Sequence, residues 1–169
     1  MLKWNELSIN TSIEKSASCH RPSTPKMHQL YQITIASWNA QGLSNPQKQT
    51  ELRFYLRTND IDILLLQETF LNWNHKLFLP NFKIHRVDRA SHGGGVAIAV
   101  RQGINFKVVP NTKTKLIEHC SISIRCRGRE TKITSAYAPR YSSDLKNDIG
   151  ALLTSSTDHI IMGDCYYYY

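Results

Sequence analysis

Four polar residues stand where strand-like segments of this sequence end, and their types suit chemistry on phosphate. The clearest case is Glu68, which closely follows the apolar residues 61 and 63–66. That run is too short for a free-standing helix and lacks polar alternation, so it predicts a strand covered on both faces. Ligands of open α/β sheets bind just beyond the carboxyl ends of such strands. The four residues are Asn39, Glu68, Tyr137 and Asp164.

Each of these residues, taken alone, could simply begin a solvated loop. Because the arrangement recurs at four predicted strand ends, we expect them to form a site. Glu, Asn and Asp offer only oxygen ligands, and the sequence shows no Cys or His cluster with zinc spacing. Mg2+ binds through one or two carboxylates and keeps waters for phosphate, so a phosphate ester is the predicted substrate class. An Asp can then orient the attacking water, and a Tyr hydroxyl can bond to the developing oxyanion.

A strand, a helix and a second strand are predicted to position the first two residues of the set. Residues 33–38 alternate and are rich in β-formers, and a turn-forming segment follows them. Asn45 has the properties of an N-cap, Pro46 suits the first helical position, and the helix is expected to end near Asn59. The strand around residues 61–66 comes next. In such a βαβ unit both strands end on the same edge of the sheet.

The remaining elements are predicted from the same kinds of pattern. The segment 93–95 is a glycine triplet, for which we expect a flexible strand entry, because no Lys-Ser/Thr pair follows as in a phosphate loop. Cys120 and Cys126 share one parity of a half-buried strand, about 20 Å apart, too far for a disulfide. Further strands are expected near residues 82–84, 96–100, 131–137 and 159–162, and a helix over residues 145–153, capped by Ser142 or Ser143.

Length and charge limit the kind of protein. With 169 residues and 41% hydrophobic content, one domain with a real core is expected, over residues 32–165. Residues 1–31 lack the hydrophobic periodicity of a helix or strand, so we expect a flexible leader there. A net charge of +8 suits a polyanionic partner, although a solvated surface would carry it too. Neither a membrane span nor a secretory signal is evident, so an intracellular protein is expected, with no membrane partner.

Five motifs occur in an order that carries a family resemblance. They are Trp38-Asn39-Ala40-Gln41-Gly42, Leu66-Gln67-Glu68-Thr69, Gly94-Gly95-Val96-Ala97-Ile98, Tyr137-Ala138-Pro139 and Met162-Gly163-Asp164. Together they resemble the endonuclease/exonuclease/phosphatase superfamily, and above all the apurinic-endonuclease-like domain that opens the polyprotein of non-LTR retrotransposons. The resemblance covers the chain from about Ile33 to Asp164.

The resemblance implies a DNase I-like fold: a four-layer α/β sandwich in which two mixed sheets pack together under outer helices. It also implies a nuclease that nicks DNA with Mg2+, or with Mn2+ in its place, and acts in the nucleus. A reverse transcriptase domain would follow on the same chain. Glu68 would be the metal ligand, with Asn39 beside it in the metal and phosphate network. Tyr137 would contact the scissile phosphate, and Asp164 would orient or deprotonate the water.

The sequence departs from the family pattern after Asp164. The family has an aromatic residue and then Asn at this point, and later a Ser-Asp-His-like segment, whereas this chain continues with Cys165 and the tyrosines 166–169. The expectation is therefore an incomplete sandwich and a truncated, catalytically impaired fragment, with a non-native tyrosine tail. Two other readings stay open: a phosphoinositide or sphingolipid phosphoesterase of the same superfamily, and a dead nucleic-acid-binding remnant.

Overall fold

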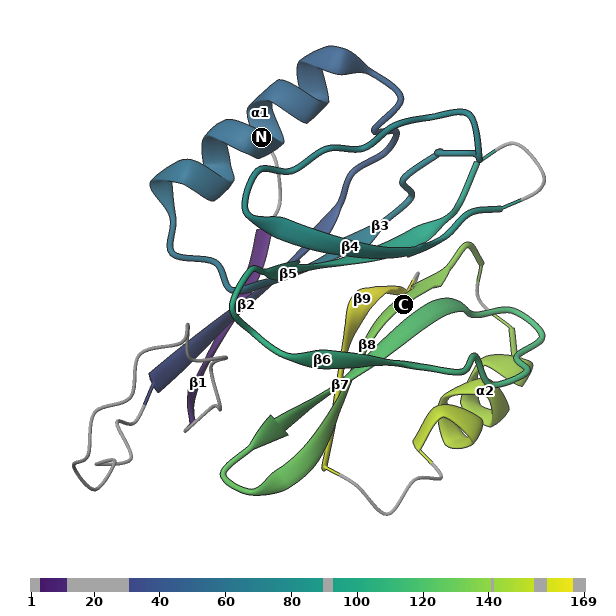
Figure 1. The fold of residues 1–169 in the computed structure, drawn as a ribbon. Helices are drawn as coiled ribbons and strands as arrows, with labels where there is room; N and C mark the ends of the chain where they lie inside the picture. Colours follow the sequence, from purple (N-terminus) through teal and green to yellow (C-terminus); the bar gives the residue numbers. More distant parts are fainter. Residues whose placement is uncertain (1–3, 12–30, 90–92, 141, 154–157, 166–169) are drawn as a thin grey trace.

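The computed structural model describes residues 4–11, 31–89, 93–140, 142–153 and 158–165. Its two sheets lie one above the other, with a helix on the outer side of each (Figure 1). The elements in chain order are β1 (Trp4–Thr11), β2 (Tyr31–Asn39), α1 (Pro46–Thr58), β3 (Ile63–Gln67), β4 (Phe82–Val87), β5 (Val96–Arg101), β6 (Phe106–Val109), β7 (Glu118–Cys126), β8 (Arg129–Ala138), α2 (Asp144–Leu153) and β9 (Asp158–Cys165).

Both sheets are mixed. The first has the strand order β1-β2-β3-β5-β4, in which only β2 and β3 run parallel. The second has the order β6-β7-β8-β9, in which only β8 and β9 run parallel. Asn39 ends β2 and Glu68 directly follows β3, whereas Tyr137 and Asp164 lie near the ends of β8 and β9.

The predicted βαβ unit is confirmed in detail. The side chain of Asn45 accepts a hydrogen bond of 2.9 Å from the backbone N–H of Gln47, and Pro46 begins α1. Asn59 ends the helix and its backbone N–H donates to the carbonyl of Tyr55. All five residues of β3 are buried, which confirms a strand covered on both faces. Strong local signals at both helix ends therefore placed α1 correctly.

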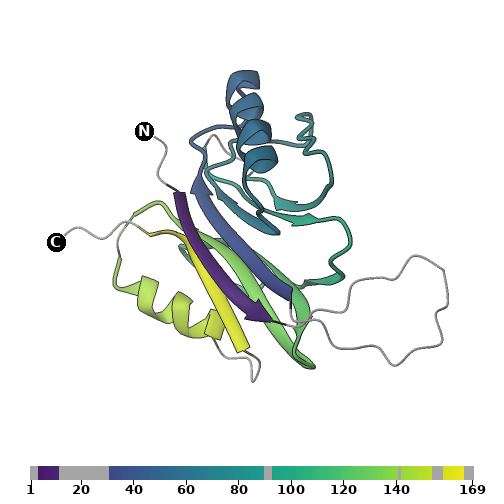
Figure 2. The same cartoon turned by 90° about the vertical axis from the view of Figure 1, so that its left-hand side faces the viewer.

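The main apolar core fills the space between the two sheets. It takes residues mainly from the central strands, including Ile35 and Leu65 from the first sheet and Ile122 and Ile133 from the second. A second cluster lies between the first sheet and α1, and a third lies between the second sheet and α2. The side view shows these four layers, with α1 and α2 on opposite outer faces (Figure 2). The fold is therefore a four-layer α/β sandwich, as predicted.

The N-terminal segment differs from the expectation of a leader without regular structure. Residues 4–11 form β1, which pairs antiparallel with β2 from Trp4 opposite Trp38 to Thr11 opposite Tyr31. The backbone of an edge strand is stabilised by its neighbour, so its own sequence needs no strong periodicity. Residues 1–3 and 12–30 lie outside the described part of the chain, as does the tyrosine tail.

Two further expectations are corrected. The strand that contains Cys120 is not half-buried, because Ser121 and Ser123 on its other parity are buried too, at 0% and 7% exposure. The last strand does not end at Met162; β9 continues to Cys165, so Asp164 lies within it. Cys120 and Cys126 are both free thiols. In the part of the chain that the structure describes, no helix is long and apolar enough to cross a bilayer.

Candidate active site

Three of the predicted residues meet at one amide group. The Nδ2 atom of Asn39 donates to Oε1 of Glu68 at 2.8 Å and to Oδ2 of Asp164 at 2.6 Å. Its Oδ1 atom accepts a hydrogen bond of 3.2 Å from the backbone N–H of Gln41. This set of partners fixes the amide orientation, because the reverse orientation would point an oxygen at two carboxylates. Asn39 thus holds together carboxylates from both sheets.

The alternation of side chains along the strands explains this meeting. Asn39 shares the parity of Ile33 and Ile35, which face the second sheet. Asp164 is the register partner of Tyr137, so both side chains leave the second sheet on the same face. Tyr137 belongs to the core between the sheets and is 7% exposed. The site therefore lies at one end of the layer between the two sheets.

Glu68 is held in an unusual backbone conformation. Its φ is +50°, in the left-handed region that disfavours residues with a Cβ. Hydrogen bonds on both sides stabilise this conformation. The Gly42 N–H donates to the Glu68 carbonyl at 2.8 Å, and the Thr69 N–H donates to the Gly95 carbonyl at 3.1 Å. Because left-handed backbone at a non-glycine residue persists only where its surroundings enforce it, these contacts aim the Glu68 side chain.

The glycine segment is not the flexible strand entry that its composition suggests. The Gly95 N–H donates to Oε2 of Glu118 at 2.7 Å, and the Arg89 Nε lies 2.9 Å from Oε1 of the same carboxylate. A Cβ at Gly94 would lie 2.6 Å from Oε2 of Glu118, so a larger residue there would displace this carboxylate. Glu118, on β7, thereby holds the glycine segment of the first sheet. The carbonyls of this segment accept hydrogen bonds from the backbone that follows Glu68.

A buried polar bridge lies directly behind the site. Gln67 accepts a hydrogen bond of 3.2 Å from the Ser37 hydroxyl and donates one of 2.9 Å to the Ser135 hydroxyl. Ser135 itself donates to the carbonyl of Leu66 at 3.0 Å. These groups are buried and hydrogen-bonded to one another, and they connect β2, β3 and β8 across the two sheets. They fix the separation of the sheets at the point where the site residues must meet.

The structure thus brings Asn39, Glu68 and Asp164 into contact and places Tyr137 beside Asp164. Their chemical roles stay predictions. Sequence reasoning missed Glu118 and Gln67. Gln67 belongs to the Leu66-Gln67-Glu68-Thr69 motif, but nothing in the sequence shows that its side chain turns inward. Glu118 is the first residue of β7, two positions before Cys120, and a carboxylate at a strand end was the available signal.

The donor set fits a divalent cation. In the described residues no group of three His, Cys, Asp or Glu side chains gathers around one point. Two carboxylates nevertheless share a single amide donor, and no ion pair in the part of the chain described here joins Glu68 or Asp164 to a lysine or arginine. Two such negative charges repel each other unless a cation lies nearby. Carboxylate oxygens are hard ligands of the kind that Mg2+ and Mn2+ prefer. Asn39 presents its NH2 group to these carboxylates, so in this structure it orients the carboxylates and its oxygen is not directed at them.

Comparison with known proteins gives a family match over most of the chain. A model of the Endonuclease/Exonuclease/phosphatase family matches residues 36–167. The RNA-directed DNA polymerase from mobile element jockey of Drosophila melanogaster is 21% identical over 136 residues. That alignment covers 79% of this chain but 15% of the fly protein. The chain therefore spans a small part of the length of this relative.

Solved structures share the fold. An AP endonuclease from Archaeoglobus fulgidus superimposes with a TM-score of 0.51 at 18% identity, covering 77% of this chain and 56% of that one. The TDP2 of D. rerio, complexed with single strand DNA product, gives a TM-score of 0.50 at 15% identity, covering 76% of this chain and 58% of that one. At these identities the likeness concerns the fold alone.

Proposed function

This chain belongs to the endonuclease/exonuclease/phosphatase family, and on that premise we propose that it is a divalent-metal-dependent phosphodiesterase that nicks DNA. The observation that carries the proposal is the single amide of Asn39 between the carboxylates of Glu68 and Asp164. Such a cluster binds a hard cation beside the place where a phosphodiester would enter. Mg2+ is the proposed metal, and Mn2+ is the proposed substitute.

The residues divide the work between them. Asn39 engages Oε1 of Glu68, which leaves Oε2 as the oxygen that would hold the metal. The metal, when bound, would neutralise charge on the phosphoryl group. Asn39 also fixes Oδ2 of Asp164, so that Oδ1 can accept a proton from the attacking water. We assign the Tyr137 hydroxyl to a hydrogen bond with the scissile phosphate.

DNA is the proposed substrate for two reasons. A net charge of +8 favours a polyanion. The proteins compared above include a mobile-element polymerase, an AP endonuclease and a protein bound to a DNA product. We therefore propose that the chain is the endonuclease segment of a mobile-element protein in which a reverse transcriptase domain lies on the same polypeptide.

We further propose that the isolated chain of 169 residues turns over slowly. Fast phosphodiester cleavage needs groups that stabilise the charge on the leaving oxygen as well as the attacking side. Neither carboxylate of the described site is paired with a lysine or arginine that could supply such a group. Residues that act as a catalytic unit are not additive, so a partial set gives much less than a proportional rate.

Metal binding is tested first, by calorimetric titration with Mn2+. Glu68→Gln is expected to weaken Mn2+ binding by about tenfold or more, since loss of even an indirect partner of a metal ligand weakens affinity by about 10- to 100-fold. Glu51→Gln, a change at an exposed carboxylate of α1, is the matched control and should bind as the parent does. Equal affinity of Glu68→Gln and the parent would remove Glu68 from the metal site.

Cleavage is tested with supercoiled plasmid and Mg2+. The parent should convert the plasmid slowly to the nicked form, and Asp164→Asn should show no conversion beyond that given by a mock purification. Inositol phosphates and sphingophospholipid headgroups serve as competitors. Strong inhibition by these headgroups without DNA nicking would replace DNA by a lipid phosphoester, and nicking that is equal in Asp164→Asn would exclude the assigned site.

A further inference from the structure

One face of helix α1 packs on the first sheet, and a second face lines a cleft. Leu52 and Leu56 are buried against that sheet, at 0% and 7% exposure. A second row of residues recurs at the i, i+3, i+4 and i+7 spacing of one helical face. This row lines a cleft of about 550 Å³, and its members are Thr50, Arg53, Phe54 and Arg57. A volume of this size lies within the range of ordinary ligand sites.

The opposite wall of the cleft is held in place by its own contacts. Pro80, Asn81 and Phe82, at the start of β4, lie across from α1 together with Arg101 from β5. The Arg101 guanidinium lies 5.4 Å from the centre of the Phe82 ring, and its Nε donates to the Ile61 carbonyl at 2.9 Å. This wall therefore keeps its shape without a ligand.

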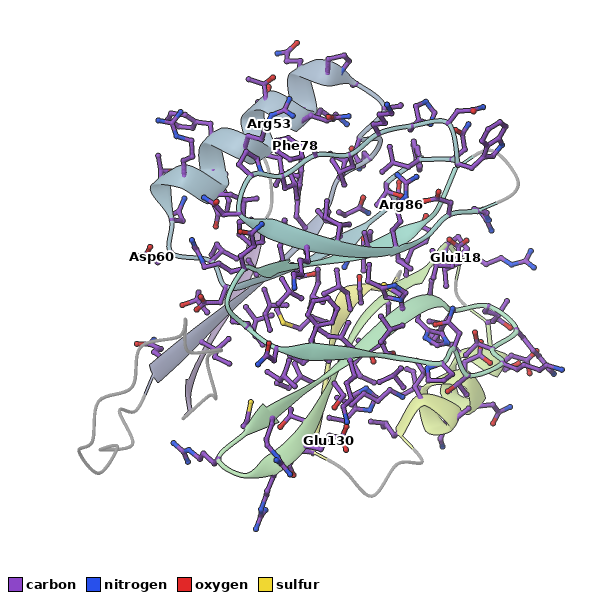
Figure 3. The ribbon with its side chains drawn as sticks, in the orientation of Figure 1. Arg53, Asp60, Phe78, Arg86, Glu118 and Glu130 are labelled. Carbon is purple, nitrogen blue, oxygen red and sulfur yellow. The ribbon has the colours of Figure 1, made fainter. Side chains whose placement is uncertain are left out.

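The α1 wall presents an aromatic ring to solvent. Phe54 is 67% exposed although it lines the cleft, so its ring face is available for contact. Arg53 stands next to it and reaches the far segment, because its Nη1 donates to the Phe78 carbonyl at 3.3 Å. Arg53, on α1, and Phe78 lie close together (Figure 3). An exposed Phe beside arginines differs from an isolated surface apolar residue, which needs no explanation.

The charge around the cleft is positive. Three arginines line it, Arg53, Arg57 and Arg101, against one carboxylate, Asp60. Arg101 is paired with Asp62 at 3.4 Å, whereas Arg57 is exposed and forms no ion pair among the described residues. A cation in the last turn also favours the helix dipole. The helix dipole accounts for the position of Arg57, but it explains neither the exposure of the Phe54 ring nor the concave shape of the cleft.

We propose that this cleft is a second nucleic-acid site, which binds single-stranded DNA or RNA by stacking a base on Phe54 while Arg57 and Arg53 contact the backbone phosphates. Aromatic rings interleaved with cations are the usual means of holding unpaired bases. The cleft includes Asp60, which precedes β3, whereas Glu68 follows the end of that strand, so about 16 Å of β3, at about 3.3 Å per residue, separates the cleft from the carboxylate site. The choice of a nucleic acid as the ligand rests on the proposed function, whereas the observed geometry of the cleft is independent of it.

The test is fluorescence anisotropy with labelled oligo(dT) in EDTA, where neither metal binding nor cleavage contributes. Phe54→Ala is expected to weaken binding about tenfold, because stacking of one base contributes about 1–3 kcal/mol. Arg57→Gln is expected to weaken binding and to reduce the slope of log K against log salt by about 0.7. A fully paired duplex of the same length should show little dependence on Phe54.

Matched controls remove residues of the same kind elsewhere. Trp73→Ala removes an aromatic side chain that is 85% exposed, and Arg129→Gln removes an exposed arginine from the β7–β8 hairpin. Both should bind oligo(dT) as the parent does. Parent-like binding by Phe54→Ala, at an unchanged melting temperature, would overturn the proposal. An equal loss of oligo(dT) affinity in Trp73→Ala would also overturn it. A Phe54-dependent affinity for polyglutamate would overturn it too, because it would indicate an acidic protein partner. Because metal is absent, failure here is separable from failure of the proposed nuclease.

Discussion

Glu118 accepts a hydrogen bond of 2.7 Å from the backbone N–H of Gly95 and thereby joins β7 of one sheet to the entrance of β5 in the other. The carbonyls of Gly94 and Gly95 accept the N–H groups of Phe70 and Thr69, at 2.9 and 3.1 Å. The segment directly after Glu68 is therefore held by a residue that makes no contact with the proposed metal. Substitutions in this chain of contacts should therefore change metal binding at the site, although the substituted residues do not touch the metal.

Gly94→Ala tests this chain of contacts. The new Cβ would lie 2.6 Å from a Glu118 oxygen, at a position where φ is +67°. Gly103→Ala is the matched control, since its φ is +95° but nothing lies within 4 Å of its Cβ. Left-handed backbone alone should lower the unfolding free energy by about 1 kcal/mol in both variants. Only Gly94→Ala should also weaken Mn2+ binding; equal effects of the two variants on stability and on metal affinity would show that Glu118 holds nothing at the site.

Asn39→Asp tests the charge balance of the carboxylate cluster. The change replaces a donor to Glu68 and Asp164 by a third negative charge. Without metal the melting temperature should fall, with a loss of about 1–3 kcal/mol in unfolding free energy from unsatisfied partners and repulsion. Saturating Mn2+ should raise the melting temperature of the variant more than that of the parent, in a differential scanning calorimeter. An identical rise in both would mean that the ion binds elsewhere.

His159 gives a pH dependence of stability. Burial, helped by the positive charges of Lys132 and His119, lowers the pKa of His159 from 6.5 to about 4, and its Nε2 lies 2.8 Å from the Thr134 hydroxyl. The unfolded chain takes up this proton more readily than the folded one. The contribution of neutral His159 is therefore complete above pH 6.5 and is lost as the pH falls from 6.5 towards 4.

The expected measurement is a set of melting curves between pH 7 and pH 4. His159→Gln, which can still bond to Thr134, should show a flatter decline of melting temperature across this window. Some decline should remain, because burial also lowers the pKa of His85. Burial alone would raise the pKa of Asp148, but three backbone N–H donors outweigh burial and lower it from 3.8. The stability that Asp148 adds is therefore complete above pH 3.8 and is lost only below it, outside the measured window. Parallel curves for parent and variant would exclude His159 as a cause.

Deletion of residues 1–30 tests the N-terminal strand. β1 covers the outer edge of β2 over eight residue pairs, so its removal should lower the melting temperature. A loss of each 1 kcal/mol corresponds to about 2–4 °C for a chain of this size. The deleted protein should also self-associate more readily in analytical ultracentrifugation, through the bare edge of β2. An unchanged melting temperature would show that the β1 pairing adds no stability.

Local signals predicted most of the helices and strands, although not β1 or β6. Asn45 and Pro46 placed α1, and the unbroken apolar run placed β3, because these signals act within a few residues. The contacts of Glu118 and Gln67 could not be predicted in this way, because their partners Gly95 and Ser135 lie 23 and 68 residues away in the chain. Ser121 likewise has the composition of a solvent face, but the third apolar cluster covers that face with α2.

The contact between Asn39 and Asp164 spans 125 residues of sequence. A ribosome adds about 5–20 residues per second, so Asn39 leaves the exit tunnel some 6–25 s before Asp164 can join it. During that interval the inner face of the first sheet awaits the strands that will cover it, and the nascent polypeptide presents an apolar surface to the cell. Binding by a chaperone at this stage would protect the chain, and synonymous codons that slow translation between β5 and β9 should lengthen the exposure and lower the yield of soluble protein.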